Sequence, residues 1–418
     1  MEKILKWKNE NVCKFNMTDY GYLIDIPKLY NRELLPLGVK MEGEIVDSLW
    51  MSAWWKNNSI PAERDSIRLG LECVGVTSED ELKLLCRGLS LTNNYWLCDP
   101  NETLRWEEIN FWDNGFSDEV GRALFSHRPL HKNVNFKSPD ASLNGMLKKT
   151  WVDKEGEFYL AKGGSGSACQ EVFNEKIASD LLKLAAAEHV EYQLGMCDNK
   201  ICCLAKCMTD RDTELIHASQ IFESIPRKGY PDHENELDYF KRTLEYYDIR
   251  YDSEQLDKML CIDYMIANTD RHYNNIGILE NKNTGERKLS PIFDNGTSLW
   301  CQTPAKHIQS RDDSIMARPF CNKTTFGSWQ EQVCFIHSYP EMDSQLVKSA
   351  IVQFGKDMKM HSDISTERIE ALTTGLAERI AGLQEILKEK GIKIPEESQM
   401  NQNDVQEVQK HLRSASGN

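Results

Sequence analysis

The sequence NTDRHYNNIGIL, residues 268–279, is the most informative segment for predicting the fold of this chain of 418 residues. It follows a segment, residues 253–267, whose apolar side chains recur with helical spacing. After that helix the chain breaks into a polar loop that carries Asp270, His272 and Asn275. Apolar residues typical of a strand come next, so the pattern predicts a helix, a polar loop and then a hairpin.

A second acidic residue follows the predicted hairpin of residues 276–293. It is Asp294, in the sequence FDNGTSL. Oxygen-bearing side chains that one hairpin brings together would repel each other without a cation, and Mg²⁺ prefers hard oxygen ligands. Phosphotransferases use this layout, so we predict that Asn275 and Asp294 bind magnesium and that Asp270 orients or deprotonates an acceptor hydroxyl.

Another hairpin is predicted upstream, in residues 142–164, around the turn sequence DKEG. Gly145 precedes its first strand, Lys162 ends its second strand, and residues 171–184 then show a helical stripe. A loop without bulky side chains lets backbone N–H groups approach phosphate oxygens, and a lysine on the neighbouring strand neutralises them. This order of parts predicts a nucleotide-binding hairpin.

The predicted helix of residues 171–184 offers a carboxylate that could hold Lys162 in place. Glu171 and Glu175 are four residues apart and therefore lie on one helical face, so either could be the partner. We favour Glu175, because it lies one turn inside the helix.

The composition limits the class of function. The chain has 50 basic and 65 acidic side chains, a formal net charge of −15, which argues against a broad basic face for nucleic acid or anionic lipid. No apolar run is long enough to cross a membrane, and the N-terminal residues lack the apolar core of a secretory signal. The chain has 13 cysteines, an odd number, which favours a reducing, cytoplasmic environment. From the charge and the absence of a long apolar run we expect binding to neither nucleic acid nor membrane.

Taken together, the motifs NTDRHYNN and FDNGTSL resemble the catalytic and metal-binding motifs of the HipA-like serine/threonine kinases. The family pattern is roughly N-x-D-x-H-x-x-N, followed about two dozen residues later by D-x-G-x-S. The resemblance implies a bacterial, ATP- and Mg²⁺-dependent kinase with a bilobal α+β fold, in which a small antiparallel β lobe sits beside a larger helical lobe. It also implies a protein substrate and a regulatory partner of the antitoxin type.

The resemblance extends to the upstream hairpin. SLNGMLKK resembles the family's nucleotide loop, Lys162 falls where the family has its ATP-binding lysine, and CCLAKCM falls at the hinge to adenine. The nucleotide contacts that it implies are Asn144, Gly145, Met146, Lys148, Lys162, Glu175, Lys206 and Met208.

Ser142 corresponds to a serine that some members of the family phosphorylate on themselves. A phosphate there would add about two negative charges beside a phosphate site and repel ATP. The alternative is that Ser142 is a turn residue whose hydroxyl binds the loop.

The sequence DRHYNNI also resembles the DRHxxNI loop of phosphoinositide kinases, in which the histidine is a candidate base. Histidine titrates near neutral pH and suits proton transfer. A loose phosphoryl transition state needs positioning more than strong deprotonation. We therefore predict Asp270 as the base, with His272 in contact with phosphate or metal-bound groups.

The domain organisation that we predict has four parts. Residues 1–138 form a tryptophan-rich region of unknown role, 139–210 the small lobe, 211–394 the helical lobe and 395–418 a polar, flexible tail. The alternatives to a protein kinase are a small-molecule or lipid kinase, and a nucleotide-sensing module without turnover.

Overall fold

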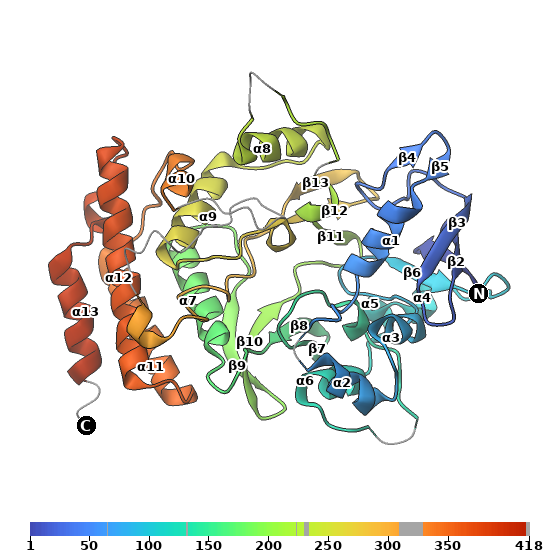
Figure 1. Cartoon of the computed structure of the whole chain (residues 1–418), viewed down its shortest axis with the longest axis horizontal. Helices are drawn as coiled ribbons and strands as arrows, with labels where there is room; N and C mark the ends of the chain where they lie inside the picture. Colours follow the sequence, from blue (N-terminus) through green and yellow to red (C-terminus); the bar gives the residue numbers. More distant parts are fainter. Residues whose placement is uncertain (65, 131–132, 223, 230–233, 309–328, 415–418) are drawn as a thin grey trace.

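The computed structural model describes residues 1–64, 66–130, 133–222, 224–229, 234–308 and 329–414. The N-terminal region lies at one end of the molecule, a small lobe built on an antiparallel sheet lies in the middle, and long helices form the other end (Figure 1). The predicted α+β fold is confirmed. Among the described residues, no helix is long and apolar enough to span a bilayer.

Three tryptophans of the N-terminal region, Trp7, Trp54 and Trp55, lie in one hydrophobic core. Trp54 and Trp55 of a short helix pack edge-on against Tyr95 and Phe15 of a four-stranded sheet with the order β3-β2-β1-β6. Their large apolar rings explain why this region is rich in tryptophan. Its elements are β1 (Glu2–Trp7), β2 (Glu10–Met17), β3 (Leu23–Leu29), β4 (Met41–Glu42), β5 (Ile45–Val46), α1 (Ser48–Asn57), α2 (Ile67–Val74), α3 (Glu79–Leu85), β6 (Tyr95–Cys98), α4 (Trp106–Ile109), α5 (Phe111–Asn114) and α6 (Glu119–Ser126).

The small lobe is an antiparallel sheet with the order β7-β8-β10-β9 and one packed helix, α7. The helical stripe predicted from the sequence is buried, with Phe173, Ile177 and Leu181 in the core. The tight turn after Lys154 pairs that residue with Glu157. The elements are η1 (Asp140–Ser142), β7 (Lys149–Lys154), β8 (Glu157–Lys162), α7 (Gln170–Leu184), β9 (Tyr192–Cys197) and β10 (Lys200–Lys206).

The helical lobe includes a three-stranded sheet in which β12 pairs with both β11 and β13. The second predicted hairpin is the pair β12 and β13, and α9 leads into its loop. The elements are β11 (Thr213–His217), η2 (Ala218–Gln220), α8 (Glu236–Tyr246), α9 (Ser253–Met265), η3 (Tyr273–Asn275), β12 (Gly277–Asn281), β13 (Glu286–Leu289), η4 (Ala305–His307), α10 (Trp329–Cys334), α11 (Ser344–His361), α12 (Thr366–Glu389), η5 (Glu396–Ser398) and α13 (Gln402–Ser414).

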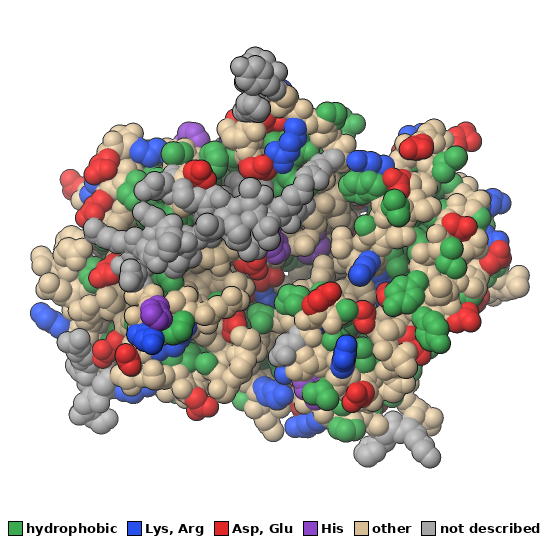
Figure 2. All heavy atoms as spheres, in the orientation of Figure 1, with side chains coloured by type: hydrophobic (Ala, Val, Ile, Leu, Met, Phe, Trp, Pro, Cys, Tyr) green, Lys and Arg blue, Asp and Glu red, His purple; other side chains and the backbone are tan. Residues whose placement is uncertain are grey.

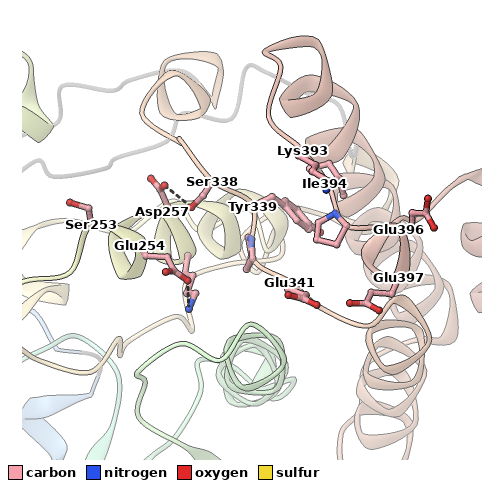
Figure 3. A pocket seen from close by; sticks show the side chains of 13 residues that line it. Ser253, Glu254, Asp257, Ser338, Tyr339, Glu341, Lys393, Ile394, Glu396 and Glu397 are labelled. Atoms are coloured by element: carbon pink, nitrogen blue, oxygen red, sulfur yellow. Dashed lines mark hydrogen bonds and ion pairs between the residues drawn. The ribbon is translucent and has the colours of Figure 1, made fainter.

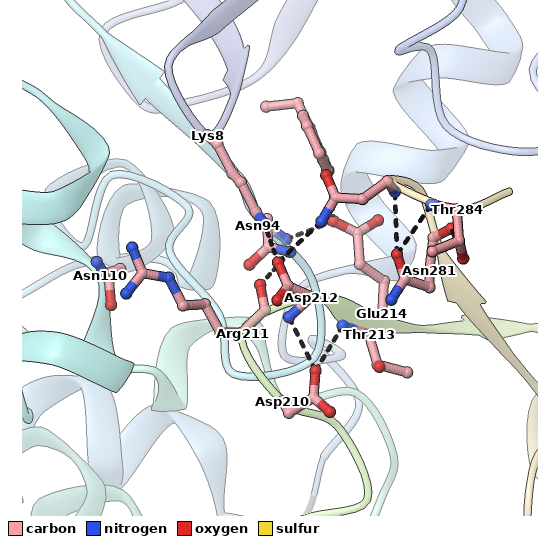
Figure 4. Close-up of polar contacts among 12 residues, drawn as sticks. Lys8, Asn94, Asn110, Asp210, Arg211, Asp212, Thr213, Glu214, Asn281 and Thr284 are labelled. Carbon is pink, nitrogen blue, oxygen red and sulfur yellow. Dashed lines mark hydrogen bonds and ion pairs between the residues drawn. The ribbon is translucent and has the colours of Figure 1, made fainter. Parts of the chain in front are cut away.

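Polar contacts attach the N-terminal region to the β11–β12 sheet (Figure 4). Lys8 Nζ donates to Asp212 Oδ1 at 2.6 Å, and the backbone N–H of Asn94 donates to Glu214 Oε1 at 2.9 Å. The indole of Trp7 also donates to Glu214, at 2.6 Å. Burial raises the pKa of Glu214, so these donors compensate a carboxylate that is removed from water. The N-terminal region is therefore integrated with the helical lobe.

The prediction that residues 395–418 form a flexible tail is wrong for most of that segment. Residues 402–414 form helix α13, which packs against α11 and α12. Its Val405, Val408 and Leu412 side chains are buried. They recur three and four residues apart, which is one helical face within an otherwise polar segment.

A charge on this face should therefore destabilise the protein. We expect Val408→Asp to lower the free energy of unfolding by about 3 kcal/mol, because it buries an unpaired carboxylate. Denaturant unfolding measures this. Gln406→Asp, on the exposed side of α13, is the matched control and should behave as wild type. Equal stability of the two variants would show that the segment is not packed.

Candidate active site

Lys162 lies at the centre of a buried charge cluster. It ends β8, is 3% exposed, and donates from Nζ to Glu175 Oε1 and, at 2.8 Å, to Asp294 Oδ1. The predicted pairing with Glu175 is confirmed. Glu171 instead accepts hydrogen bonds from the backbone amide, at 3.1 Å, and the hydroxyl of Ser165. One lysine thus joins β8, α7 and the loop after β13.

Mutual attraction favours the charged forms of Lys162 and Asp294. Burial alone would lower the pKa of Lys162, but the carboxylates of Asp294 and Glu175 outweigh burial and raise it well above its ordinary value. Burial raises the pKa of Glu175. Burial would raise the pKa of Asp294 as well, yet Lys162 and Lys149 lower it below its ordinary value.

Lys149 is a member of the site that the sequence analysis missed. It is 7% exposed, and within the described part of the chain its Nζ donates no hydrogen bond. Burial lowers the pKa of Lys149 to about 7, although Asp294 partly opposes this. A buried amine without a partner favours an anionic ligand.

The turn of the hairpin was the signal that could have revealed Lys149. The tight turn between Lys154 and Glu157 sets the register and pairs Lys149 with Lys162. Side chains directly opposite each other in an antiparallel pair lie on the same face. The residue named from the sequence, Lys148, lies next to this position and is half-buried.

The polar loop before β12 brings its three predicted residues together. Asn275 donates from Nδ2 to the carbonyl of Asp270 at 2.8 Å and to its carboxylate at 3.4 Å. His272 Nε2 lies 3.5 Å from Asp270 Oδ1. The side chains of Asp270 and His272 are 31% and 27% exposed, so both are accessible from the solvent.

Arg271, within the same loop, is buried and was not singled out from the sequence. Its guanidinium forms a bidentate ion pair with Asp263 of α9, with both distances 2.9 Å. It also donates to the carbonyls of Asn275, at 2.9 Å, and Phe293, at 2.7 Å. A fifth bond reaches the side chain of Asn295. Arg271 therefore holds the loop of Asp270 beside the loop of Asp294.

Asp294 itself has a left-handed backbone, with φ of +59°, which aspartate tolerates better than most residues. Its neighbours hold this conformation: the amide of Asn295 donates to Glu175 Oε2 at 2.8 Å, and the amide of Asp294 donates to the Tyr192 hydroxyl at 3.3 Å. The carboxylate is thereby turned toward Lys162.

The predicted nucleotide loop is close to this cluster. Gly145 has φ of +103°, and a β-carbon there would collide with Lys149 Nζ. The side chain of Asn144 accepts a hydrogen bond from the Gly145 amide at 2.6 Å. Met146 is exposed. The loop therefore places the backbone of Gly145, rather than a bulky side chain, beside the buried amine.

Three of the predicted site residues lie outside the charge cluster. Lys206 pairs with the exposed Glu157, and the register of β10 puts it on the sheet face opposite Lys162, so its side chain does not join the cluster. Ser142 is buried, and its hydroxyl donates to the carbonyl of Leu89 at 3.0 Å, so this conformation does not offer it for phosphorylation. Met208 is half-buried against the main core.

The described residues fit a magnesium nucleotide. Asn275 uses its amide nitrogen for Asp270, which leaves Oδ1 for a metal, and Asp294 supplies a carboxylate. Magnesium needs only one or two protein oxygens when phosphates and water complete its shell. Lys162 and Lys149 would lie next to the phosphates. Figure 2 shows acidic and histidine side chains gathered in a central hollow between the N-terminal region and the helical lobe.

A separate hollow of about 880 Å³ lies away from this cluster, between α9 and the segment before η5 (Figure 3). It is lined by several carboxylates, among them Glu254, Glu341 and Glu397. It contains none of the residues of the charge cluster, so it is not part of the candidate active site.

Comparison with known proteins identifies one family. A family model described as the HipA-like C-terminal domain matches residues 141–362. No curated protein matches the chain. Similar solved structures include the Helicobacter pylori proinflammatory kinase CtkA, with 19% identity over 64% of this chain and 95% of that chain and a TM-score of 0.41. Another is HipA of Shewanella oneidensis MR-1, in a complex with HipB and operator DNA, with 12% identity over 99% of this chain and 96% of that chain and a TM-score of 0.45.

The ion pair of Arg271 should be essential for stability. We expect Arg271→Met to lower the free energy of unfolding by about 3–5 kcal/mol, because Asp263 is left buried without its cation. Adding Asp263→Leu should recover part of the loss, since both charges are then gone. Arg250→Met, which removes only an exposed ion pair with Glu286, is the control. Denaturant unfolding measures the free energy of unfolding of each variant. If Arg271→Met is as stable as this control, the ion pair with Asp263 is not essential for stability.

Proposed function

The chain belongs to the HipA-like C-terminal domain family, whose model spans more than half of it, and from this premise we propose that it is an ATP- and magnesium-dependent kinase. The substrate that we propose is a serine or threonine of a protein. The observation that carries the proposal is the buried contact of Lys162 with Glu175 and Asp294, beside a loop that holds Asp270 and Asn275.

The roles that we propose follow from where these side chains lie. Lys162 and Lys149 bind the phosphates, and Glu175 keeps Lys162 in place. Magnesium, bound by Asn275 and Asp294, would supply positive charge at the phosphate oxygens. Asp270 orients the acceptor hydroxyl and takes its proton as that oxygen bonds to the γ-phosphorus and the bond to ADP breaks. His272, next to Asp270, contacts the phosphate.

A protein substrate is favoured over a lipid, because a chain with a net charge of −15 repels anionic headgroups. We also propose a cytoplasmic location and a regulatory protein partner of the antitoxin type, which the family resemblance implies. A small-molecule kinase and a nucleotide sensor without turnover are the alternatives.

Intact-mass spectrometry after incubation with ATP, magnesium and candidate protein acceptors tests the proposal. We expect wild type to add phosphate to an acceptor or to itself. Asp270→Asn should bind ATP with nearly unchanged affinity but transfer nothing, because it loses the carboxylate that positions the hydroxyl. Asp363→Asn, an exposed residue of the helical lobe, is the control and should transfer normally.

The other outcomes separate the alternatives. Phosphate on a sugar or lipid alone would indicate a small-molecule or lipid kinase. ATP binding without any transfer would indicate the sensor. Transfer by Asp270→Asn at the rate of wild type would contradict the role of Asp270.

Nucleotide binding should also take up a proton at Lys149. The pKa of Lys149 is about 7 in the free protein, so the amine is mostly neutral at higher pH. A bound phosphate favours the charged form and raises this pKa. At about pH 8 we expect uptake of roughly one proton per ATP. Calorimetry in buffers of different ionisation enthalpy measures it. We expect no proton uptake in Lys149→Met and unchanged proton uptake in the control Lys148→Met. If Lys149→Met still takes up a proton, another group is responsible.

A further inference from the structure

We infer that the N-terminal region completes the nucleotide site through Arg64, which acts as a positioning residue for the nucleotide loop. The inference rests on the proposed function, because it assigns a role in ATP binding to a residue outside the matched family segment. It also gives a role to a part of the chain in which the sequence showed no chemistry.

Arg64 reaches the loop from far away in the sequence. Its Nε donates to the carbonyl of Gly145 at 2.8 Å, and its Nη2 donates to the carbonyl of Leu143. The side chain is 5% exposed. A buried guanidinium is costly unless its donors are used, so this placement is specific.

Charge compensation supports the placement. Burial lowers the pKa of Arg64 to about 10, while the nearby carboxylate of Asp140 raises it. Asp140 is itself buried and accepts from the amide of Trp151 at 2.9 Å and the hydroxyl of Ser138 at 2.8 Å. The start of the loop is thus held by Asp140, and its tip by Arg64.

The two carbonyl contacts determine where the loop amides point. In a trans peptide the C=O and the following N–H point in opposite directions. The carbonyls of Leu143 and Gly145 face Arg64, so the amides of Asn144 and Met146 face away from it. Within the described residues, neither amide donates a hydrogen bond. Backbone amides that point into the same concave loop can bind an anion, and these two amides lie on the same side of the loop.

Lys149 lies beside this loop, because a β-carbon on Gly145 would meet its Nζ. The loop amides and this buried amine are therefore close to each other. Among the described residues, the hydrogen bonds that Arg64 donates to the loop end on carbonyl oxygens, so it acts on phosphate through the amides that it orients. The N-terminal region also holds Ser142, through the carbonyl of Leu89 at 3.0 Å.

The test compares nucleotides that differ in their phosphates. Calorimetric titrations of the full chain would use Mg·ATP, Mg·ADP and adenosine against wild type, Arg64→Met and Arg64→Lys. We expect Arg64→Met to weaken ATP and ADP at least about tenfold and to change adenosine by less than about twofold. Arg64→Lys can keep one hydrogen bond to the loop, so its affinity for ATP and ADP should lie between those of wild type and Arg64→Met. Arg87→Met, which removes an arginine paired with Glu102 in the same region, is the matched control and should bind as wild type.

Hydrogen exchange of residues 142–148 in the ligand-free protein is the second measurement. We expect faster exchange in both Arg64 variants and not in Arg87→Met; if Arg64→Met fails to fold, Arg64→Lys decides both measurements. The inference is overturned if the Arg64 variants bind ATP with the affinity of wild type. It is also overturned if they lose as much affinity for adenosine as for ATP. If wild type itself fails to bind ATP, the proposed function fails, and the exchange data still report whether Arg64 holds the loop.

Discussion

The geometry of the candidate active site depends on one buried guanidinium, that of Arg271. Arg271 pairs with Asp263 of α9 and donates to the carbonyls of Asn275 and Phe293. These two carbonyls belong to the two loops that carry the acidic residues, so a single side chain determines how far apart the loops lie. Such a charge is stable in the interior only because its donors are used on several fixed acceptors. Within the loop that Arg271 anchors, Asn275 donates to the carbonyl of Asp270, so the two predicted site residues are held together without a ligand.

The second constraint is the balance of charge around Lys162. Two lysines, Lys162 and Lys149, face two carboxylates, Glu175 and Asp294, but only Lys162 is paired with both. Lys149 remains without a partner in the described residues and has a lowered pKa. A cluster that has one amine without an anion favours a ligand that brings negative charge, and a nucleotide phosphate would do so.

The N-terminal region supplies part of this environment. Arg64 holds the nucleotide loop from one side, and contacts of Lys8 and Asn94 attach the region to β11. The loop lies between that region and the sheet of the small lobe. The candidate active site is therefore built from three parts of the chain, although the family model begins only at residue 141.

The two hairpins, the helix with Glu175 and the loop with Asp270 could be predicted in their order from the amino-acid sequence, because turns and apolar periodicity act over a few residues. The short turn between Lys154 and Glu157 also contains the register that places Lys149 opposite Lys162. Other features depend on long-range packing: Arg64 meets Gly145, Arg271 meets Asp263 and Phe293, and residues 402–414 form a packed helix. The physical reason is that a buried polar contact depends on which surfaces pack together, and local spacing does not encode the partner of a residue that is distant in the chain.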